Sequence, residues 1–236
     1  FEAYLKIIES DPAILAETKN LMTVSISHFF RDHALWRALE NEILPELIKC
    51  YRNSISVWCA GSALGQEVYS LKMLWQNLTF RGIPLPKLQI TATDSNPDYL
   101  KRAKEGIFEK NALKGITEND INRHFQTFDN GENFRIADYL KKDINWIHHD
   151  MIGQSPPDKS FQIIFLRNNL LTYYRENLRK STIVKIVESL DKGGFLIIGT
   201  HEKIPDLIPD LTSFKKYEYI LKLCNKLRGI SDCLVS

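Results

Sequence analysis

Short apolar runs alternate along most of the chain with longer segments of helical periodicity, and this alternation limits the possible folds more than any other feature. The strand-like runs, which begin at residues 55, 88, 144, 161 and 195, are ISVWCAG, LQITATD, INWIHHD, FQIIFLRN and FLIIGTH. Helical patterning covers 66–78, 95–106 and 175–190. Parallel strands buried on both faces have such apolar runs, and connecting helices cover those faces. The sequence therefore predicts an α/β fold on a mostly parallel sheet that helices cover on both faces.

The regions outside this alternation predict additions to the sheet. Residues 1–49 are expected to form an N-terminal helical segment and linker, truncated here because no methionine begins it, with Pro45 kinking the last helix or starting another. Residues 50–236 are expected to form the main domain. Within it, the polar stretch 111–142 predicts a small inserted antiparallel β-subdomain with a hairpin turn at Asn130-Gly131. A terminal strand is predicted at 214–223, and DKGG at 191–194 is predicted to end the preceding helix.

The composition of the 236 residues excludes some classes of function. Lys+Arg 31 against Asp+Glu 29 leaves a net charge of +2, which gives no overall attraction to nucleic acid or an anionic membrane. No apolar run is long enough to cross a bilayer, and residues 1–10 lack a signal-peptide pattern. The four cysteines have no zinc-type spacing and are expected to be reduced and mostly buried. We predict a cytoplasmic protein that is neither membrane-embedded nor nucleic-acid-binding.

Two features predict a ligand at the carboxyl ends of the strands. The turn from Gly61 to Gly65 follows the first strand, where glycine allows close approach of a ligand and the next helix offers free N–H groups. Asp94 ends the following strand, where a carboxylate can accept the hydroxyl hydrogens of a ribose. These features leave both a nucleotide-type ligand and a plain tight connection open. The turn lacks the signature of an ATP- or GTP-binding phosphate loop.

Two further clusters have more than one interpretation. In SISHFFRD (25–32), Phe29 and Phe30 would be core residues and Arg31–Asp32 a solvated pair on composition alone. In the run His148, His149 and Asp150, only the first and last share a strand face, so we predict no metal site.

Five segments, in order, resemble the CheR-type chemotaxis receptor methyltransferases. That family has Asn-x-Thr-x-Phe-Phe-Arg-Asp and Gly-x-Glu-x-Tyr-Ser, where this chain has SISHFFRD and GQEVYS. Its second strand ends in Ala-Thr-Asp, as here, and its fourth runs into Cys-Arg-Asn-x-x-Ile-Tyr-Phe, matched by LRNNLLTY. A later Gly-Gly, strand and Glu resemble Gly193-Gly194 and the stretch through Glu202. The resemblance implies the Rossmann-like class I fold of an S-adenosylmethionine (SAM)-dependent methyltransferase.

The resemblance also implies roles for individual residues. With SAM as cofactor and S-adenosylhomocysteine (SAH) as product, Glu67 would engage the amino group of the methionine part, and Asp94 the ribose hydroxyls. The catalytic pocket would be lined by Arg31, Arg167, Thr172, which stands where the family has a tyrosine, and its neighbour Tyr173. The remaining implied cofactor contacts are Ser25, Ser27, Ala60, Gly61, Asp150 (a family Asn near the adenine), Met151 and Leu166, with Arg31 and Arg167 also touching the cofactor.

The function that the resemblance implies is glutamate O-methylation of the cytoplasmic helical domain of bacterial chemoreceptors, by a monomer. A receptor glutamate is already ionised at neutral pH, so no general base is needed, and Arg31 is expected to orient it. Ser25, Asp150 and Thr172 depart from the family pattern. They keep two alternatives open: a non-catalytic SAM- or SAH-binding regulatory module, and a methyltransferase with another acceptor. The segment 126–134 looks short, so no strong docking of a receptor tail peptide is expected.

Overall fold

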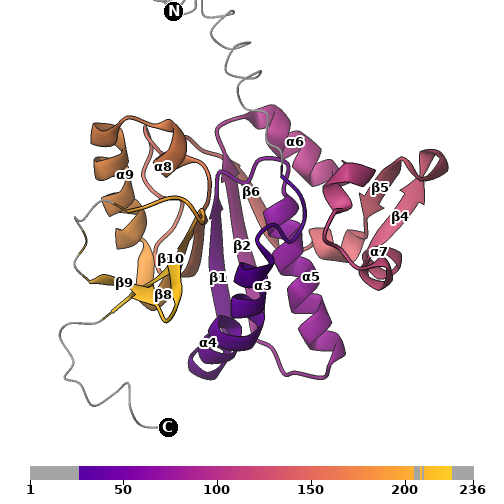
Figure 1. The fold of residues 1–236 in the computed structure, drawn as a ribbon, viewed down its shortest axis with the longest axis horizontal. Helices are drawn as coiled ribbons and strands as arrows, with labels where there is room; N and C mark the ends of the chain where they lie inside the picture. The colour runs from indigo at the N-terminus through magenta and orange to yellow at the C-terminus, as the bar shows by residue number, and fades with distance from the viewer. Residues whose placement is uncertain (1–26, 205–207, 209, 225–236) are drawn as a thin grey trace, which may run out of the picture.

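The computed structural model describes residues 27–204, 208 and 210–224. The central element is a seven-stranded sheet in the order β6-β2-β1-β7-β8-β10-β9 (Figure 1). Its first five strands are mutually parallel, while β10 runs antiparallel to both of its neighbours. In chain order the strands are β1 Ser54–Ala60, β2 Lys87–Asp94, β6 Ile144–His148, β7 Phe161–Leu166, β8 Leu190–Ile198, β9 Leu211–Phe214 and β10 Tyr217–Leu223. The predicted mostly parallel α/β sheet is confirmed.

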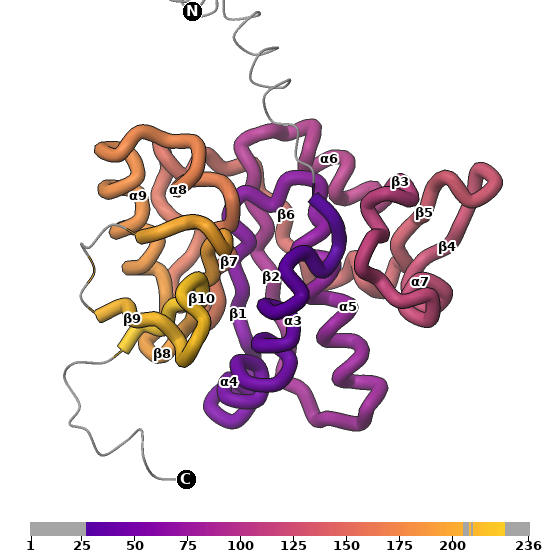
Figure 2. Tube along the Cα trace, viewed as in Figure 1, coloured from indigo at the N-terminus to yellow at the C-terminus, as the bar shows by residue number. Residues whose placement is uncertain are grey.

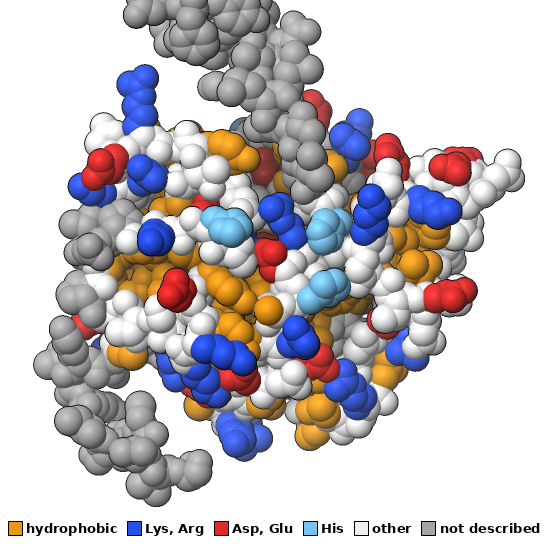
Figure 3. All heavy atoms as spheres, viewed as in Figure 1, with side chains coloured by type: hydrophobic (Ala, Val, Ile, Leu, Met, Phe, Trp, Pro, Cys, Tyr) orange, Lys and Arg blue, Asp and Glu red, His pale blue; other side chains and the backbone are white. Residues whose placement is uncertain are grey.

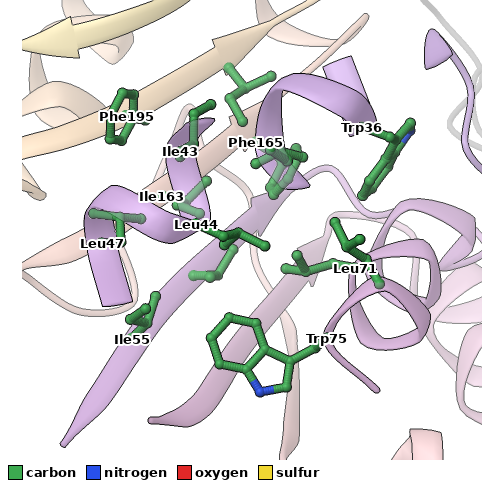
Figure 4. Packing of buried hydrophobic residues seen from close by; sticks show 14 of the residues in the cluster. Trp36, Ile43, Leu44, Leu47, Ile55, Leu71, Trp75, Ile163, Phe165 and Phe195 are labelled. Atoms are coloured by element: carbon green, nitrogen blue, oxygen red, sulfur yellow. The ribbon is translucent and has the colours of Figure 1, made fainter. Parts of the chain in front are cut away.

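Helices cover both faces of this sheet. One face is covered by α5 (Gln66–Phe80) and by a helical run of three parts, namely α3 (His33–Ala38), a π-helical turn η1 (Leu39–Ile43) and α4 (Leu44–Cys50). Pro45 lies in the first turn of α4, but Ile43 and Leu44 keep right-handed helical conformation, so the run changes from a π-helical turn to an α-helix there without a break. The opposite face is covered by α8 (Leu170–Tyr173) and α9 (Glu176–Glu188). Side chains of the inner strands point alternately into two apolar layers, one on each face of the sheet. Figure 4 shows part of the layer between the sheet, the α3–α4 run and α5.

A three-stranded antiparallel sheet, in the order β3-β5-β4, is inserted between β2 and β6. In the tube of Figure 2 it projects to one side of the central sheet. Helix α6 (Pro97–Glu105) leads into β3 Ile107–Glu109, β4 Phe125–Phe128 and β5 Asn133–Ile136, joined by α7 (Glu118–His124) and the short turns η2 (Lys110–Leu113), η3 (Asp129–Gly131) and η4 (Asp138–Lys141). The hairpin at Asn130-Gly131 is confirmed, because β4 pairs with β5 across that turn. The insertion begins earlier than the predicted residue 111. Its first strand, β3, follows directly after Gly106, which ends α6 in a left-handed conformation.

Several details differ from the prediction. DKGG does not end a helix: β8 already begins at Leu190, and its pairing with β7 is irregular before Ile163. The predicted single strand at 214–223 is a hairpin, because Lys215 adopts a left-handed conformation between β9 and β10. Cys50 and Cys224 are exposed and only Cys59 of the three described cysteines is buried, so the prediction of mostly buried thiols is wrong. Ser25, Cys233 and the first half of the predicted N-terminal helical segment, residues 1–26, lie outside the described residues.

The described part of the chain contains no helix long and apolar enough to cross a membrane. Side chains of both charges are interspersed over the face seen in Figure 3, in keeping with the small net charge of the whole chain.

Candidate functional site

The glycine turn after β1 is fastened to the end of β2. The N–H groups of Gly61 and Ser62 both donate to the carbonyl oxygen of Thr93 at 2.8 Å, and the N–H of Ala63 donates to Oδ2 of Asp94 at 2.8 Å. Gly61 has φ +79°, and a Cβ built on it would lie 1.9 Å from Nδ2 of Asn169. Glycine is therefore required there both for its conformation and for the close approach of the loop after β7. Ala60, Gly61 and Asp94, which were predicted from separate motifs, lie together at this sheet edge.

Asp94 offers a carboxylate whose geometry is already fixed. Its Oδ1 accepts the N–H of Asn96 at 2.9 Å, and Asn96 in turn caps α6 through its own side chain. Burial raises the pKa of Asp94, and the backbone N–H groups that it accepts oppose that rise. A carboxylate has about four acceptor positions. The backbone N–H groups of Ala63, Ser95 and Asn96 already act on this one, which leaves capacity for a ribose hydroxyl.

A buried arginine joins three segments of the chain. Arg167, which follows β7, donates from Nη1 to Oε2 of Glu67 on α5 at 2.7 Å and from Nη2 to Oδ2 of Asp32. The side chain of Arg167 is 5% exposed and that of Glu67 is 20% exposed. Burial raises the pKa of Glu67, while the positive charges of Arg167 and Arg31 act in the opposite direction. Arg31, Glu67 and Arg167 therefore form one electrostatic cluster, as the predicted pocket requires.

The segment SISHFFRD supplies both packing and charge. Phe29 is fully buried, and the N–H of Phe30 donates to the Ser70 hydroxyl of α5 at 2.9 Å. Asp32, in a left-handed conformation, carries the ion pair to Arg167. The aromatic pair is core, as composition suggested, but the interpretation of Asp32 as a solvated side chain is wrong. Ser27 is half-buried.

The end of β6 brings a second carboxylate near Asp94. The N–H of His149 donates to the carbonyl oxygen of Asp94 at 3.0 Å, and Asp150 follows it, with its Oδ1 accepting the N–H of Ile152 at 3.0 Å. Met151 is buried beside it. Burial and the negative charges of Asp150 and Asp94 raise the pKa of Tyr174, a half-buried residue that the sequence analysis missed. Its family position carried no motif that could have identified it.

The two histidines at the end of β6 are engaged by the backbone. Nε2 of His148 lies 3.0 Å from the carbonyl oxygen of Ser95, and Nε2 of His149 lies 2.8 Å from that of Ser155. Within the described ranges, no cluster of three or more His, Cys, Asp or Glu residues is arranged to hold a metal ion.

The loop after β7 places the predicted residues differently. β7 ends at Leu166, which is fully buried, and the chain then turns into α8. Thr172 and Tyr173 lie on this short helix rather than on an extended strand, and Tyr173 is 73% exposed. The Thr172 hydroxyl donates to Oε1 of Glu202 at 2.6 Å.

Several polar atoms at this edge are buried without a hydrogen-bond partner in the described structure. They are Oγ of Ser62, Oε1 of Gln66 and Nε of Arg167. An unpaired buried polar atom is costly, so such atoms mark places where a ligand can pair them. Ser62 and Gln66 belong to the turn and helix that follow β1, and Arg167 to the loop beside them. Together with the half-buried carboxylates of Glu67 and Asp94, they fit a ligand that has an ammonium group, a carboxylate and a ribose, as SAM has.

Comparison with known proteins gives matches over most of the chain. The family model described as "CheR methyltransferase, SAM binding domain" matches residues 25–220. A chemotaxis protein methyltransferase of Listeria monocytogenes is 32% identical over 204 residues, which cover 86% of this chain and 75% of that protein. Another from Vibrio parahaemolyticus is 29% identical over 189 residues, covering 79% and 67% respectively. Among solved structures, the N-methyltransferase NodS from Bradyrhizobium japonicum in complex with SAH aligns with 15% identity and a TM-score of 0.40, over 72% of this chain and 63% of that one.

Proposed function

The chain belongs to the CheR methyltransferase family and is a SAM-dependent methyltransferase, and from that premise we propose that it methylates glutamate side chains in the cytoplasmic helical domain of chemoreceptors. The observation that carries the proposal is the cluster of Arg31, Arg167 and Glu67, which lies at the carboxyl ends of the parallel strands, as Asp94 does. It combines acidic groups for a cationic cofactor with guanidinium groups for an anionic substrate. The relatives in Listeria and Vibrio are named as chemotaxis methyltransferases, which supports a receptor as partner.

The acidic residues would hold SAM. Glu67 would accept from the ammonium group of its methionine part, while Asp94 would accept from the ribose hydroxyls. Asp150 and Met151 would lie near the adenine, and Gln66 and Ser62 would pair polar atoms of the amino-acid part. SAM supplies a methyl group made electrophilic by its sulfonium centre.

The arginines divide two tasks. Arg167 is held between Glu67 and Asp32, so its guanidinium positions Glu67 and closes the buried end of the pocket. We assign the orientation of the substrate carboxylate to Arg31, whose positive charge also acts on Glu67. Because the carboxylate is ionised at neutral pH, no residue has to remove a proton, and correct orientation in a water-poor site supplies the rate enhancement.

An Arg31→Ala variant tests this assignment. Turnover is expected to fall by about 100-fold or more, because loss of orientation affects the reacting geometry, while the affinity for SAH falls by less than about tenfold. Methyl esters formed on a chemoreceptor cytoplasmic fragment are measured as methanol released by base, and SAH binding by titration calorimetry. A variant with normal methylation rates would refute the role of Arg31.

The regulatory alternative has one observation in its favour. The hydroxyl of Thr172, at the position of the family tyrosine, is bonded to Glu202. A chain that binds SAM and SAH in the calorimeter but forms no base-labile methyl ester on receptor fragments would be a binding module. Esters on a small-molecule acid but not on receptor would favour another acceptor.

A further inference from the structure

One carboxylate joins three separate points around the loop after β7. Oε2 of Glu202 accepts the N–H of Gly199 at 2.6 Å and the N–H of Asn168 at 2.9 Å. Oε1 accepts the hydroxyl of Thr172 at 2.6 Å. These donors come from the end of β8, from the end of β7 and from α8. Glu202 thereby uses both of its oxygens to connect two adjacent strand ends and the helix beside them.

The loop that Glu202 holds has an unfavourable backbone. Asn168 has φ +50°, a left-handed conformation that costs a residue other than glycine some free energy. Such a conformation persists when surrounding contacts determine it. Gly199 contributes to this tight junction, because a Cβ built there would lie 2.6 Å from Oδ1 of Asn168 and 2.8 Å from Oε2 of Glu202.

The same loop forms one wall of the site. Arg167, at its start, holds Glu67 and Asp32, and the amide of Asn169 lies against Gly61. A shift of this backbone would therefore move the guanidinium and the wall of the glycine turn together.

We propose that Glu202 is a positioning residue of the methyl-transfer site: its carboxylate locks segment 167–172 in the shape that presents Arg167 and Asn169. Only the expected effect on cofactor binding rests on the proposed function. The hydrogen bonds of Glu202, which we call the lock, form within the protein without any ligand. The lock also gives a task to Thr172, whose hydroxyl serves as its third donor instead of facing the reaction.

Backbone exchange separates the lock from general stability. In Glu202→Ala, the amide hydrogens of Asn168 and Gly199 lose their acceptor, so their exchange is expected to become about tenfold faster or more, while amides of the inner strands such as Ile164 stay unchanged. The affinity for SAH, measured by calorimetry, is expected to fall by about tenfold because Arg167 and Asn169 are displaced.

The conservative variant provides the decisive comparison. In Glu202→Gln the amide oxygen can accept both N–H groups and the NH₂ can donate to Oγ1 of Thr172, so exchange and SAH affinity should stay within about twofold of wild type. Thr172→Val removes only the hydrogen bond from the Thr172 hydroxyl. Its exchange rates and SAH affinity should lie between those of Glu202→Ala and Glu202→Gln. Glu188→Ala, at an exposed glutamate ending α9, serves as the control.

The outcomes distinguish this inference from the proposed function. If Glu202→Ala exchanges and binds SAH like wild type, or if Glu202→Gln is as impaired as alanine, the lock does not exist. Should Glu202→Ala fail to fold, the comparison of Glu202→Gln and Thr172→Val with wild type decides the question. If the wild-type chain binds neither SAM nor SAH, the proposed function fails, while the exchange measurements still test the lock.

Discussion

Gly61 and Gly82 have nearly the same backbone conformation and very different surroundings. Their φ angles are +79° and +76°, but a Cβ at Gly61 would meet Asn169, whereas nothing lies within 4 Å of one at Gly82. Gly82→Ala is expected to cost roughly 1–2 kcal/mol of unfolding free energy from its backbone alone. Gly61→Ala should cost about 1–3 kcal/mol more and weaken SAH binding. Urea denaturation and calorimetry of both variants check this, and equal losses would mean that Asn169 does not wall the turn.

Asp94 leads to a prediction about pH. Since burial raises its pKa, it takes up a proton at higher pH than an ordinary aspartate when the solution is acidified. A protonated carboxyl accepts ribose hydroxyls poorly, so SAH affinity should fall as the pH drops through that raised pKa. Glu67, whose pKa is also raised by burial, adds to the decline.

Calorimetric SAH titrations across the acidic range check this dependence. Asp94→Asn should bind more weakly at neutral pH and lose affinity less steeply on acidification. The folded protein binds more protons at Asp94 than the unfolded chain does, so this carboxyl's contribution to stability declines as the pH rises through its folded-state pKa. A wild-type affinity that stays flat from neutral pH down through the range where ordinary aspartates titrate would contradict the role of Asp94.

At the residue scale, the sequence predicts those site residues that end strands or begin helices. Gly61 and Asp94 could be singled out because they lie at the ends of apolar runs, whereas Glu67 was singled out by the resemblance of GQEVYS to the family motif. The partner of Asp32 could not, because Arg167 lies 135 residues away and no local pattern connects them. The resemblance implied that Thr172 lies near the pocket. The sequence did not show where β7 ends, because the turn after it depends on the left-handed backbone of Asn168.

At the element scale, the helical run from α3 through α4 is part of the main core. Leu44 is fully buried in the same cluster as Ile55 of β1 and Phe165 of β7 (Figure 4). Glu42 and Glu46 bind Lys215 and Lys222 of the β9–β10 hairpin. The run therefore joins the sheet through apolar packing and through ion pairs at its outer side.

Leu44→Ala should consequently destabilise the whole domain. We expect a loss of about 2–5 kcal/mol in the free energy of unfolding, in a single cooperative transition. Leu178→Ala, on the partly exposed side of α9, should cost less than about 1 kcal/mol. Chemical denaturation followed by circular dichroism gives both values. A separate early transition in Leu44→Ala would show that the helical run folds independently of the sheet.

The elements themselves were largely predictable from periodicity. The five parallel strands and the helix at Pro97 follow from apolar runs and a capping sequence. The β9–β10 hairpin was not predictable, because its turn uses Lys215-Lys216 rather than glycine or asparagine. The glycines at 193–194 were misassigned since they lie inside β8, where Gly194 has backbone atoms of Asp191 and Gln162 close by.

At the scale of the whole molecule, one aromatic cluster connects the two sheets. Phe29 packs edge-on against Phe108 of β3 and Phe125 of β4, with ring centroids 4.8 and 5.3 Å away. Tyr69 of α5 packs on Phe108 as well. The segment that carries Arg31 and Asp32 is thus fixed between the central sheet and the inserted one.

Phe29→Ala should loosen that junction. We expect a loss of about 3–5 kcal/mol of unfolding free energy, together with faster amide exchange in β3 and β5. Phe80→Ala, at a side chain that is 56% exposed, should cost at most about 1 kcal/mol. If the small sheet keeps its protection in Phe29→Ala, its attachment depends on other contacts.

The overall arrangement was predictable only in class. Alternating strands and helices indicate a parallel sheet, but the order β6-β2-β1-β7-β8-β10-β9 depends on long-range pairings that no single segment encodes. The inserted sheet was recognised from its polar composition, whereas its packing on Phe29 depends on residues about 80 positions apart.

Arg167 is shared by α5 and by the segment before α3, so a change at one of its two carboxylate partners also affects the other. Whatever draws Glu67 toward a cofactor alters the counter-charge left for Asp32, and the reverse holds by the same factor. Titrations with SAH are therefore to be repeated in the presence of a chemoreceptor fragment, and titrations with the fragment in the presence of SAH. Reciprocity requires each ligand to change the affinity for the other by the same factor.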